Sequence, residues 1–327
     1  MTRRVLITGA TGGLGGALVR EGLRRGLSVR ATGRSATAGA ALIEQGAEFV
    51  PADLTVPNDL SALLRGCDGV IHAAALSASW GPRQAFEAAN VEATAALLRA
   101  AKAAGVRRFV FVSSPSIFAA FRDRLGIAPD DPPTEPPLNH YARTKLAGER
   151  MVLAADEGAF ACAVVRPRAL VGEGDRVILP RLAALAGRPR LPLPRGGRAL
   201  IELTDLRDAA WAICELEARL PALRGRAVNV SGQQPVMVRT VATDLAAALG
   251  HAPRLLDVPV PLARAAASAM EAAARLRGST EEPTLTRYTL ATLAYSQTFD
   301  RSAEALLGYA AKHDALATLL ESARGRR

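Results

Sequence analysis

Near the N-terminus, a short apolar run ends in a cluster of glycines. Residues 4–10 read RVLITGA, which is typical of a buried strand, and the TGGLGGAL that follows begins a helical pattern. A strand that turns through glycines into a helix can bring its backbone and the helix N-terminus against a pyrophosphate. The pattern predicts a dinucleotide-binding turn, the alternative being a glycine-rich turn without a ligand. Its expected residues are Gly9, Thr11, Gly12, Gly13, Leu14 and Gly15.

The glycines recur every third residue, and each has a separate expected role. Gly9 should allow the tight turn. Gly12 should let the backbone approach the ligand, and Gly15 should let the helix pack close to the strand.

The first half of the chain continues this alternation of strands and helices. Apolar runs at 28–34, 47–54, 69–75 and 108–114 are separated by helical patterns, of which 85–105 is the longest. Short apolar strands between amphipathic helices predict an α/β fold of the Rossmann type, with a doubly wound parallel sheet covered on both faces.

The regular alternation of strands and helices ends after residue 114. Residues 124–140 carry five prolines and predict a loop at the edge of a site, followed by a helix over about 141–157 and a strand over 162–167. We expect an NAD(P)-binding domain over 1–167. A smaller substrate-binding region should cover 168–327, with some elements able to return to the first sheet.

Composition narrows the classes of function. The net charge of +10 comes from scattered arginines, which does not favour nucleic-acid binding but suits an anionic cofactor or substrate. The apolar window 258–276 contains charged residues, so it predicts a surface helix, on its own domain or on a membrane or partner, and no membrane span. Three distant cysteines (Cys67, Cys162 and Cys214) indicate no disulfide framework and no metal site, as in a reducing cytoplasm.

The strand ends indicate which cofactor the turn would hold. The second strand ends ATGRS, with no acid for the adenosine ribose, and Arg34 could pair with a 2′-phosphate. This favours NADP and leaves NAD open, since Arg34 could also be a solvated surface residue. Asp53, followed by Leu54, could accept a hydrogen bond from the adenine amine or cap a turn. Ala73 and Ala74 leave room for a flat cofactor, and His72 before them is expected in the core.

A tyrosine and a lysine stand four residues apart in NHYARTKLAGE. The chain has three lysines against 38 arginines, so lysine at position 145 is a specific choice. On a helix, Tyr141 and Lys145 share one face, and the ammonium would lower the pKa of the phenol and make it a general acid/base. A compact ammonium can also bond a ribose hydroxyl, which a planar guanidinium does less well. The alternative is an ordinary exposed pair.

Serines follow the fifth strand in VFVSSPSIF. Ser113, Ser114 and Ser116 stand where the carboxyl ends of parallel strands meet ligands. A serine there could hydrogen-bond the substrate oxygen that Tyr141 protonates or deprotonates. The alternative is that the serines cap the next turn.

Together, the glycine motif, the serine-bearing strand end and Tyr-x-x-x-Lys resemble the extended short-chain dehydrogenase/reductase family. NVEAT at 90–94, RPRALVGEGD at 166–175 and IELTDLRDAA at 201–210 resemble further landmarks of that family. SSPSIF and EEPTLTRY resemble its 3β-hydroxysteroid dehydrogenase-like branch, which includes 2-alkyl-3-ketoalkanoic acid reductases.

The resemblance implies roles for individual residues. It makes Ser114 catalytic with Tyr141 and Lys145, adds Ser113 as a second serine, and places the nicotinamide end near Pro167. It also implies a homodimer through the helices at about 85–104 and 141–157. Pro115-Ser116 replaces the acidic pair of the family's sugar dehydratases, which disfavours dehydration but excludes epimerisation less firmly.

These observations favour an NADP-dependent oxidoreductase that acts on a ketone or secondary alcohol. VILPRLAAL at 177–185 suggests a largely apolar small-molecule substrate, steroid-like or a β-keto acid. Arg168, Arg176 or Arg181 could bind a carboxylate or be surface residues. The alternatives are an NAD-dependent nucleotide-sugar epimerase and a non-catalytic regulator that senses NADP.

Overall fold

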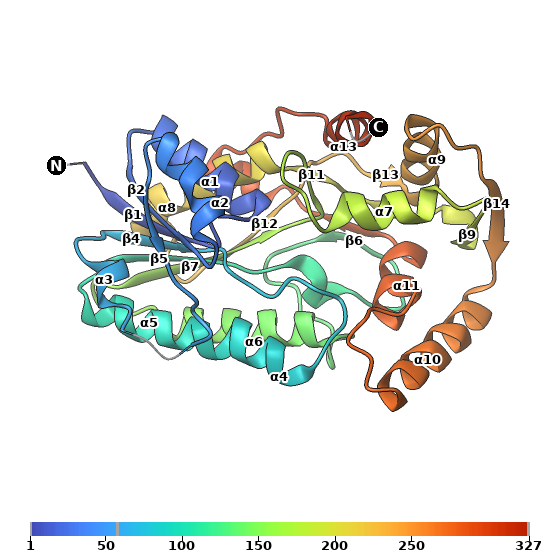
Figure 1. The fold of residues 1–327 in the computed structure, drawn as a ribbon, viewed down its shortest axis with the longest axis horizontal. Helices are drawn as coiled ribbons and strands as arrows, with labels where there is room; N and C mark the ends of the chain where they lie inside the picture. Colours follow the sequence, from blue (N-terminus) through green and yellow to red (C-terminus); the bar gives the residue numbers. More distant parts are fainter. Residues whose placement is uncertain (1, 57–58, 326–327) are drawn as a thin grey trace.

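The computed structural model describes residues 2–56 and 59–325. A seven-stranded sheet forms its centre, with the order β12-β7-β5-β4-β1-β2-β3 and every neighbouring pair parallel (Figure 1). The strands are β1 (Arg4–Thr8), β2 (Ser28–Gly33), β3 (Glu48–Pro51), β4 (Gly69–His72), β5 (Arg108–Val112), β7 (Ala161–Pro167) and β12 (Ala227–Val230). The predicted fold class is confirmed.

Helices cover both faces of this sheet, as the apolar strands require. One face packs on α1 (Gly13–Arg24), α2 (Ala36–Glu44), α8 (Leu206–Leu223) and α12 (Ser302–Leu307). The other face packs on α3 (Ser61–Leu64), α5 (Ala93–Ala103) and α6 (His140–Ala154). Figure 1 shows α1 and α8 above the sheet, with α5 and α6 below it.

One strand from beyond residue 167 belongs to the central sheet, and helices from this part of the chain cover it. β12 pairs with β7, and α8 packs against α1 across the same core. The first sheet therefore draws on both halves of the sequence.

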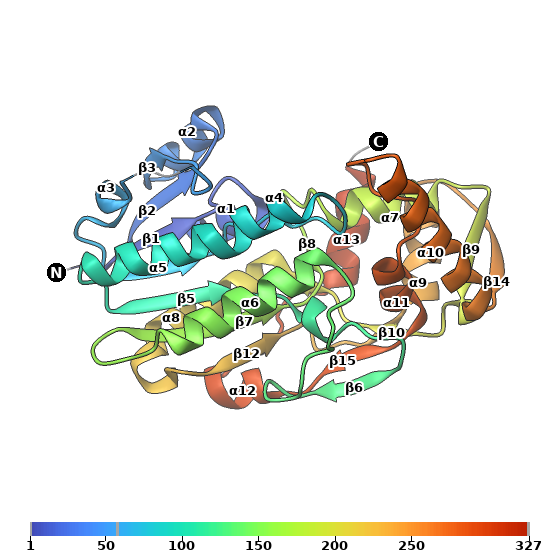
Figure 2. The same ribbon diagram turned by 90° about the horizontal axis from the view of Figure 1, so that it is seen from below.

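The remaining elements lie beyond the carboxyl ends of the central strands (Figure 2). Helices there are α7 (Ile178–Ala186), α9 (Val238–Ala248), α10 (Val260–Leu276), α11 (Arg287–Ala294) and α13 (Ala315–Arg324). They accompany three small sheets: β9 (Arg190–Pro194) with β14 (Arg254–Val258), β8 (Leu170–Val171) with β11 (Thr204–Asp205), and β13 (Val236–Met237) with β10 (Leu200–Ile201), β15 (Gln297–Phe299) and β6 (Arg124–Ile127).

Two stretches differ from the predicted loops and irregular structure. The start of 124–140 forms β6, which pairs with β15 more than 170 residues later. Pro192 and Pro194 lie in β9, an edge strand of a two-stranded sheet, where a missing backbone donor is tolerated. Neither the pairing of β6 with β15 nor the pairing of β9 with β14 has a signal in the local sequence.

The apolar run at 177–185 predicts an apolar substrate from sequence alone. In the structure it forms most of α7, whose Leu179, Leu182 and Ala186 pack with residues of α9 and α13. Packing within this region explains the run, so the run itself gives no evidence about the substrate.

Candidate active site

The glycine turn between β1 and α1 has a backbone that side chains would obstruct. Gly9 has a φ of +68°, and its carbonyl accepts a hydrogen bond from Gly12 N at 3.0 Å. A Cβ on Gly15 would lie 2.1 Å from Gly9 O, whereas a Cβ on Gly12 would meet only Gly9 O, at 3.4 Å. The open side of Gly12 and the free N–H groups of the α1 N-terminus fit a cofactor pyrophosphate.

The end of β4 lies directly against this turn. A Cβ on Gly9 would come within 2.8 Å of the backbone of Ala74, whose N–H donates to Thr8 Oγ1 at 3.1 Å. Thr8 Oγ1 also lies 2.8 Å from His72 Nδ1, and His72 Nε2 lies 3.0 Å from Thr94 Oγ1. Burial, with a smaller contribution from Lys145, lowers the pKa of His72 to about 3. His72 is therefore a neutral core residue that fixes the ends of β1 and β4.

The predicted adenosine-binding residues gather where β2 and β3 end. A Cβ on Gly33 would lie 2.8 Å from Thr11 Oγ1, so the glycine turn touches the end of β2. Arg34 is exposed there. Asp53 accepts hydrogen bonds from Thr55 N and Oγ1, which lower its pKa, and the charge of Arg34 adds to this effect.

Two residues predicted to contact the cofactor also have packing roles. Leu14 packs against the core on the α1 side of the sheet, and Leu54 packs against the core on the other side.

The Ser114 and Tyr141 side chains meet at the carboxyl edge of the sheet. Ser114 precedes the 3₁₀ helix Pro115–Phe118, and its hydroxyl accepts from Ser116 N at 3.2 Å. Asn139 caps α6 by accepting from Ala142 N at 2.8 Å, which begins the helix just before Tyr141. Burial raises the pKa of the Tyr141 phenol, while hydrogen bonding to Ser114 and Ser77 opposes this shift.

Ser77, which interacts with Tyr141, is a candidate site residue that the sequence motifs did not indicate. It lies in the loop after β4, five residues beyond His72, and no motif separates it from Ser79 in the same loop.

Lys145 is on α6 with Tyr141, but its surroundings differ from the expectation. It is 2% exposed, and its Nζ lies over the Phe111 ring, 4.1 Å from the centroid. Burial lowers the pKa of Lys145 to about 7, and Glu149 opposes this shift. The expected lowering of the Tyr141 pKa by Lys145 does not occur here, because burial raises that pKa and the groups that oppose burial are Ser114 and Ser77.

A buried asparagine holds the loop after β4 against α6. Asn90 lies in a π-helical turn, Ala88–Glu92, between α4 (Arg83–Glu87) and α5. Its Oδ1 accepts from Leu76 N at 2.7 Å, and its Nδ2 donates to Thr144 Oγ1 at 3.0 Å. The prediction of a helix over 85–105 does not include this π-helical turn. The turn places the Asn90 amide between the loop after β4 and α6.

Ser113 and Pro167 complete the carboxyl edge of the sheet. Ser113 N donates to Val165 O at 2.7 Å, and within the described chain its buried hydroxyl lacks a hydrogen-bond partner. The segment after Pro167 returns to the glycine turn, since a Cβ on Gly13 would lie 2.7 Å from Gly174 O.

The three candidate carboxylate-binding arginines have different environments. Arg176 is exposed. Arg181 donates to Ser79 Oγ at 2.9 Å and pairs with Glu282 at 2.7 Å. Arg168 is buried directly after Pro167.

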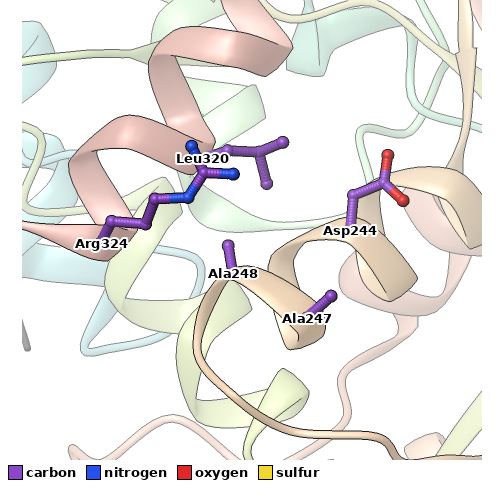
Figure 3. A pocket seen from close by; sticks show the side chains of 5 residues that line it. All are labelled: Asp244, Ala247, Ala248, Leu320 and Arg324. Atoms are coloured by element: carbon purple, nitrogen blue, oxygen red, sulfur yellow. The ribbon is translucent and has the colours of Figure 1, made fainter.

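A surface hollow of about 420 Å³ lies between α9 and α13 (Figure 3). Asp244, Ala247, Ala248, Leu320 and Arg324 line it. It contains none of the predicted site residues, so we place the site at the edge of the central sheet.

Comparisons with known proteins identify the family of this chain. The model of the NAD dependent epimerase/dehydratase family matches residues 5–231. The chain belongs to this family. It is thus an extended short-chain dehydrogenase/reductase, an NAD(P)-dependent enzyme, as its sequence predicts.

Individual relatives support the reductase branch. The chain is 37% identical to YbjS of Escherichia coli, covering 94% of this chain and 92% of that protein. It is 31% identical to a 2-alkyl-3-oxoalkanoate reductase of Shewanella oneidensis, covering 91% and 79%. Among solved structures, MoeE5 in complex with UDP-glucose and NAD matches with a TM-score of 0.74 and 26% identity over 99% of both chains.

Within residues 2–56 and 59–325, no helix has the length and apolarity needed to cross a membrane. In the same part of the chain, no three His, Cys, Asp or Glu side chains cluster in a way that could hold a metal ion.

Proposed function

We propose that this enzyme is an NADP(H)-dependent oxidoreductase that interconverts a ketone and a secondary alcohol on a largely apolar substrate. The observation that carries the proposal is the meeting of Tyr141 with Ser114 and with Ser77, whose loop begins with the Ala73 and Ala74 backbone that lies against Gly9. When bound, the nicotinamide would supply or accept the hydride. Gly9, Gly12, Gly13 and Gly15 would hold its pyrophosphate, Asp53 the adenine, and Lys145 a ribose hydroxyl.

Tyr141 is the proton donor for reduction in this proposal. A phenol with a raised pKa stays protonated at neutral pH, which suits donation to a carbonyl oxygen. Ser114 and Ser77 would orient that oxygen and stabilise the phenolate left on Tyr141. Residues 73–74 and Pro167 would border the nicotinamide end.

Exposed Arg34 and the lack of an acid at the end of β2 support NADP as the cofactor. The apolar substrate rests on the name of the Shewanella relative, a 2-alkyl-3-oxoalkanoate reductase. A steroid-like ketone remains a second candidate. An NAD-dependent nucleotide-sugar epimerase is the alternative that MoeE5, with its UDP-glucose and NAD, brings forward.

Cofactor titration followed by turnover with a carbonyl panel tests the proposal. Wild type should bind NADPH more tightly than NADH. Arg34→Ala should weaken NADPH binding about 10-fold or more, by loss of a charge-assisted contact, and leave NADH binding unchanged. Arg20→Ala, on exposed surface of α1, is the control. NAD retained through purification would favour the epimerase, and NADPH binding with no turnover of any carbonyl would favour a sensor.

We also propose a homodimer through α5 and α6, and a cytoplasmic location consistent with three buried free cysteines. Light scattering should give about twice the 34.2 kDa of one chain. A monomer at micromolar concentration would refute the dimer, and recovery in another compartment on fractionation would refute the location.

A further inference from the structure

Among the residues that the structure describes, Arg168 is a buried cation without an ion-pair partner. It directly follows β7 at the ligand-facing edge of the sheet and is 8% exposed. Its buried Nε has no hydrogen-bond partner, and across the described chain its guanidinium makes no ion pair within 4.0 Å. A charge held away from water in this way is costly unless an anion and hydrogen bonds compensate for it.

The backbone fixes Arg168 in place. Arg168 N donates to Val230 O at 2.8 Å, and its carbonyl accepts from the Thr204 hydroxyl. The next residue, Ala169, has a φ of +39°, a conformation that an alanine rarely adopts. Hydrogen bonds to β12 and β11 thus stabilise the strained turn at Arg168 and Ala169.

The fold offers Arg168 no good anion. Glu202 is an acid whose charge acts on Arg168, but Glu202 is 2% exposed and, within the described residues, its Oε2 also lacks a hydrogen-bond partner. Burial raises the pKa of Glu202, which favours its neutral form. The other basic candidates differ, since Arg181 already pairs with Glu282 and Arg176 is in water.

Tyr288 of α11 connects Arg168 to the reacting groups. Burial raises the pKa of the Tyr288 phenol, and the charges of Arg168 and Tyr141 act on it in opposite directions. Tyr288 is therefore close enough to both the Arg168 guanidinium and Tyr141, the proposed proton donor, for their charges to act on it.

We infer that Arg168, assisted by the Tyr288 hydroxyl, binds a carboxylate of the substrate beside the carbonyl that is reduced. This rests on the proposed function and adds the residues that would select an acid over a neutral ketone. A guanidinium binds a carboxylate through two parallel hydrogen bonds, and the Tyr288 phenol can donate a third. In a 3-oxo acid the carboxyl carbon is two bonds from the carbonyl carbon, so holding one group orients the other toward Tyr141 and Ser114.

The test compares a 3-hydroxy acid with its methyl ester, both oxidised with NADP⁺, in wild type and in variants. Wild type should prefer the acid by about 100-fold in kcat/KM, as expected for a bidentate charged contact. Arg168→Met should reduce this preference to near one while ester turnover stays within about threefold. Tyr288→Phe should reduce the preference about 5- to 10-fold, as for one hydrogen bond.

Three comparisons keep the test decisive. Arg176→Met, an exposed arginine of the same segment, should keep the preference for the acid. The acid/ester ratio is unaffected by partial unfolding of a variant, and Arg168→Lys gives a second, charge-retaining variant. Equal use of acid and ester by wild type, or an equal loss of both in Arg168→Met, would overturn the inference while the oxidoreductase stands. No turnover of either compound or of any other carbonyl or alcohol would overturn the proposed function.

Discussion

Lys145 shows how burial changes the chemistry of a single residue. Its ammonium lies over Phe111 in the core, near Glu149 and the neutral His72. The sequence predicts its helix and its spacing from Tyr141. Burial lowers the pKa of Lys145, and Phe111 of β5, which is distant in the chain, contributes to that burial, so a local pattern could not predict the shift.

Replacing Lys145 should separate stability from activity. Lys145→Met should raise the free energy of unfolding at pH 7 by about 1–4 kcal/mol, because an apolar group replaces a buried cation. It should also lower kcat at least about 100-fold, because the contact proposed to position the cofactor ribose is lost. Chemical denaturation and initial rates measure the two effects. Lys102→Met, a partly exposed lysine paired with Glu157, should change stability by only about 0.5 kcal/mol.

The stability difference between Lys145→Met and wild type should depend on pH. The folded pKa of Lys145, about 7, lies below its ordinary value of 10.5, so between these values the unfolded chain binds more protons. Wild type should therefore gain stability relative to the variant as pH rises from about 7 to 10.5. A pH-independent difference would show that Lys145 titrates normally in the fold.

At the scale of elements, the turn between β1 and α1 makes the most specific demand on sequence. A Cβ at Gly15 would lie 2.6 Å or less from backbone atoms of Gly9 and Ala10, which cannot move without opening the turn. At Gly16 the nearest atoms would be 3.7 Å or more away. Gly15 and Gly16 are adjacent in α1, but a Cβ would clash with the backbone at Gly15 and would fit at Gly16.

Alanine substitutions at these two positions should have opposite effects. Gly15→Ala should destabilise the protein by about 1–3 kcal/mol, as overpacking does, and weaken NADPH binding. Gly16→Ala should stabilise it by up to about 1 kcal/mol, since alanine is the better helix former. Thermal unfolding measures the stability of the two variants, and cofactor titration measures their NADPH binding. Normal NADPH binding by Gly15→Ala would contradict the role assigned to the turn.

An element could be predicted where a pattern in its own sequence causes it, and could not where contacts between distant residues cause it. The central strands could be predicted from apolar runs, and α6 corresponds to the helix expected over about 141–157. The Asn139 cap that begins α6 was not predicted. The pairings β6–β15 and β9–β14 could not be predicted, because their partners lie far away and prolines obscure the strands. The π turn at Asn90 depends on its bonds to Leu76 and Thr144, which exist only in the folded chain.

At the scale of the whole molecule, the proposed site lies where two halves of the chain meet. Strands before residue 168 supply the glycine turn, Ser114 and the end of β7. Elements after it supply Gly174 against Gly13, and Tyr288 near Tyr141. The sequence indicated the residues of the first half by motif, but it could not show that Tyr288 joins them.

Transfer of deuterium from [4-²H]NADPH to a ketone, in wild type and Tyr141→Phe, tests the central claim most directly. We expect wild type to place the label on the new carbinol carbon with one NADPH consumed per alcohol formed. Tyr141→Phe should bind NADPH normally and lose at least about 100-fold in this transfer. Full activity of Tyr141→Phe, or conversion of substrate without net NADPH consumption, would contradict the account.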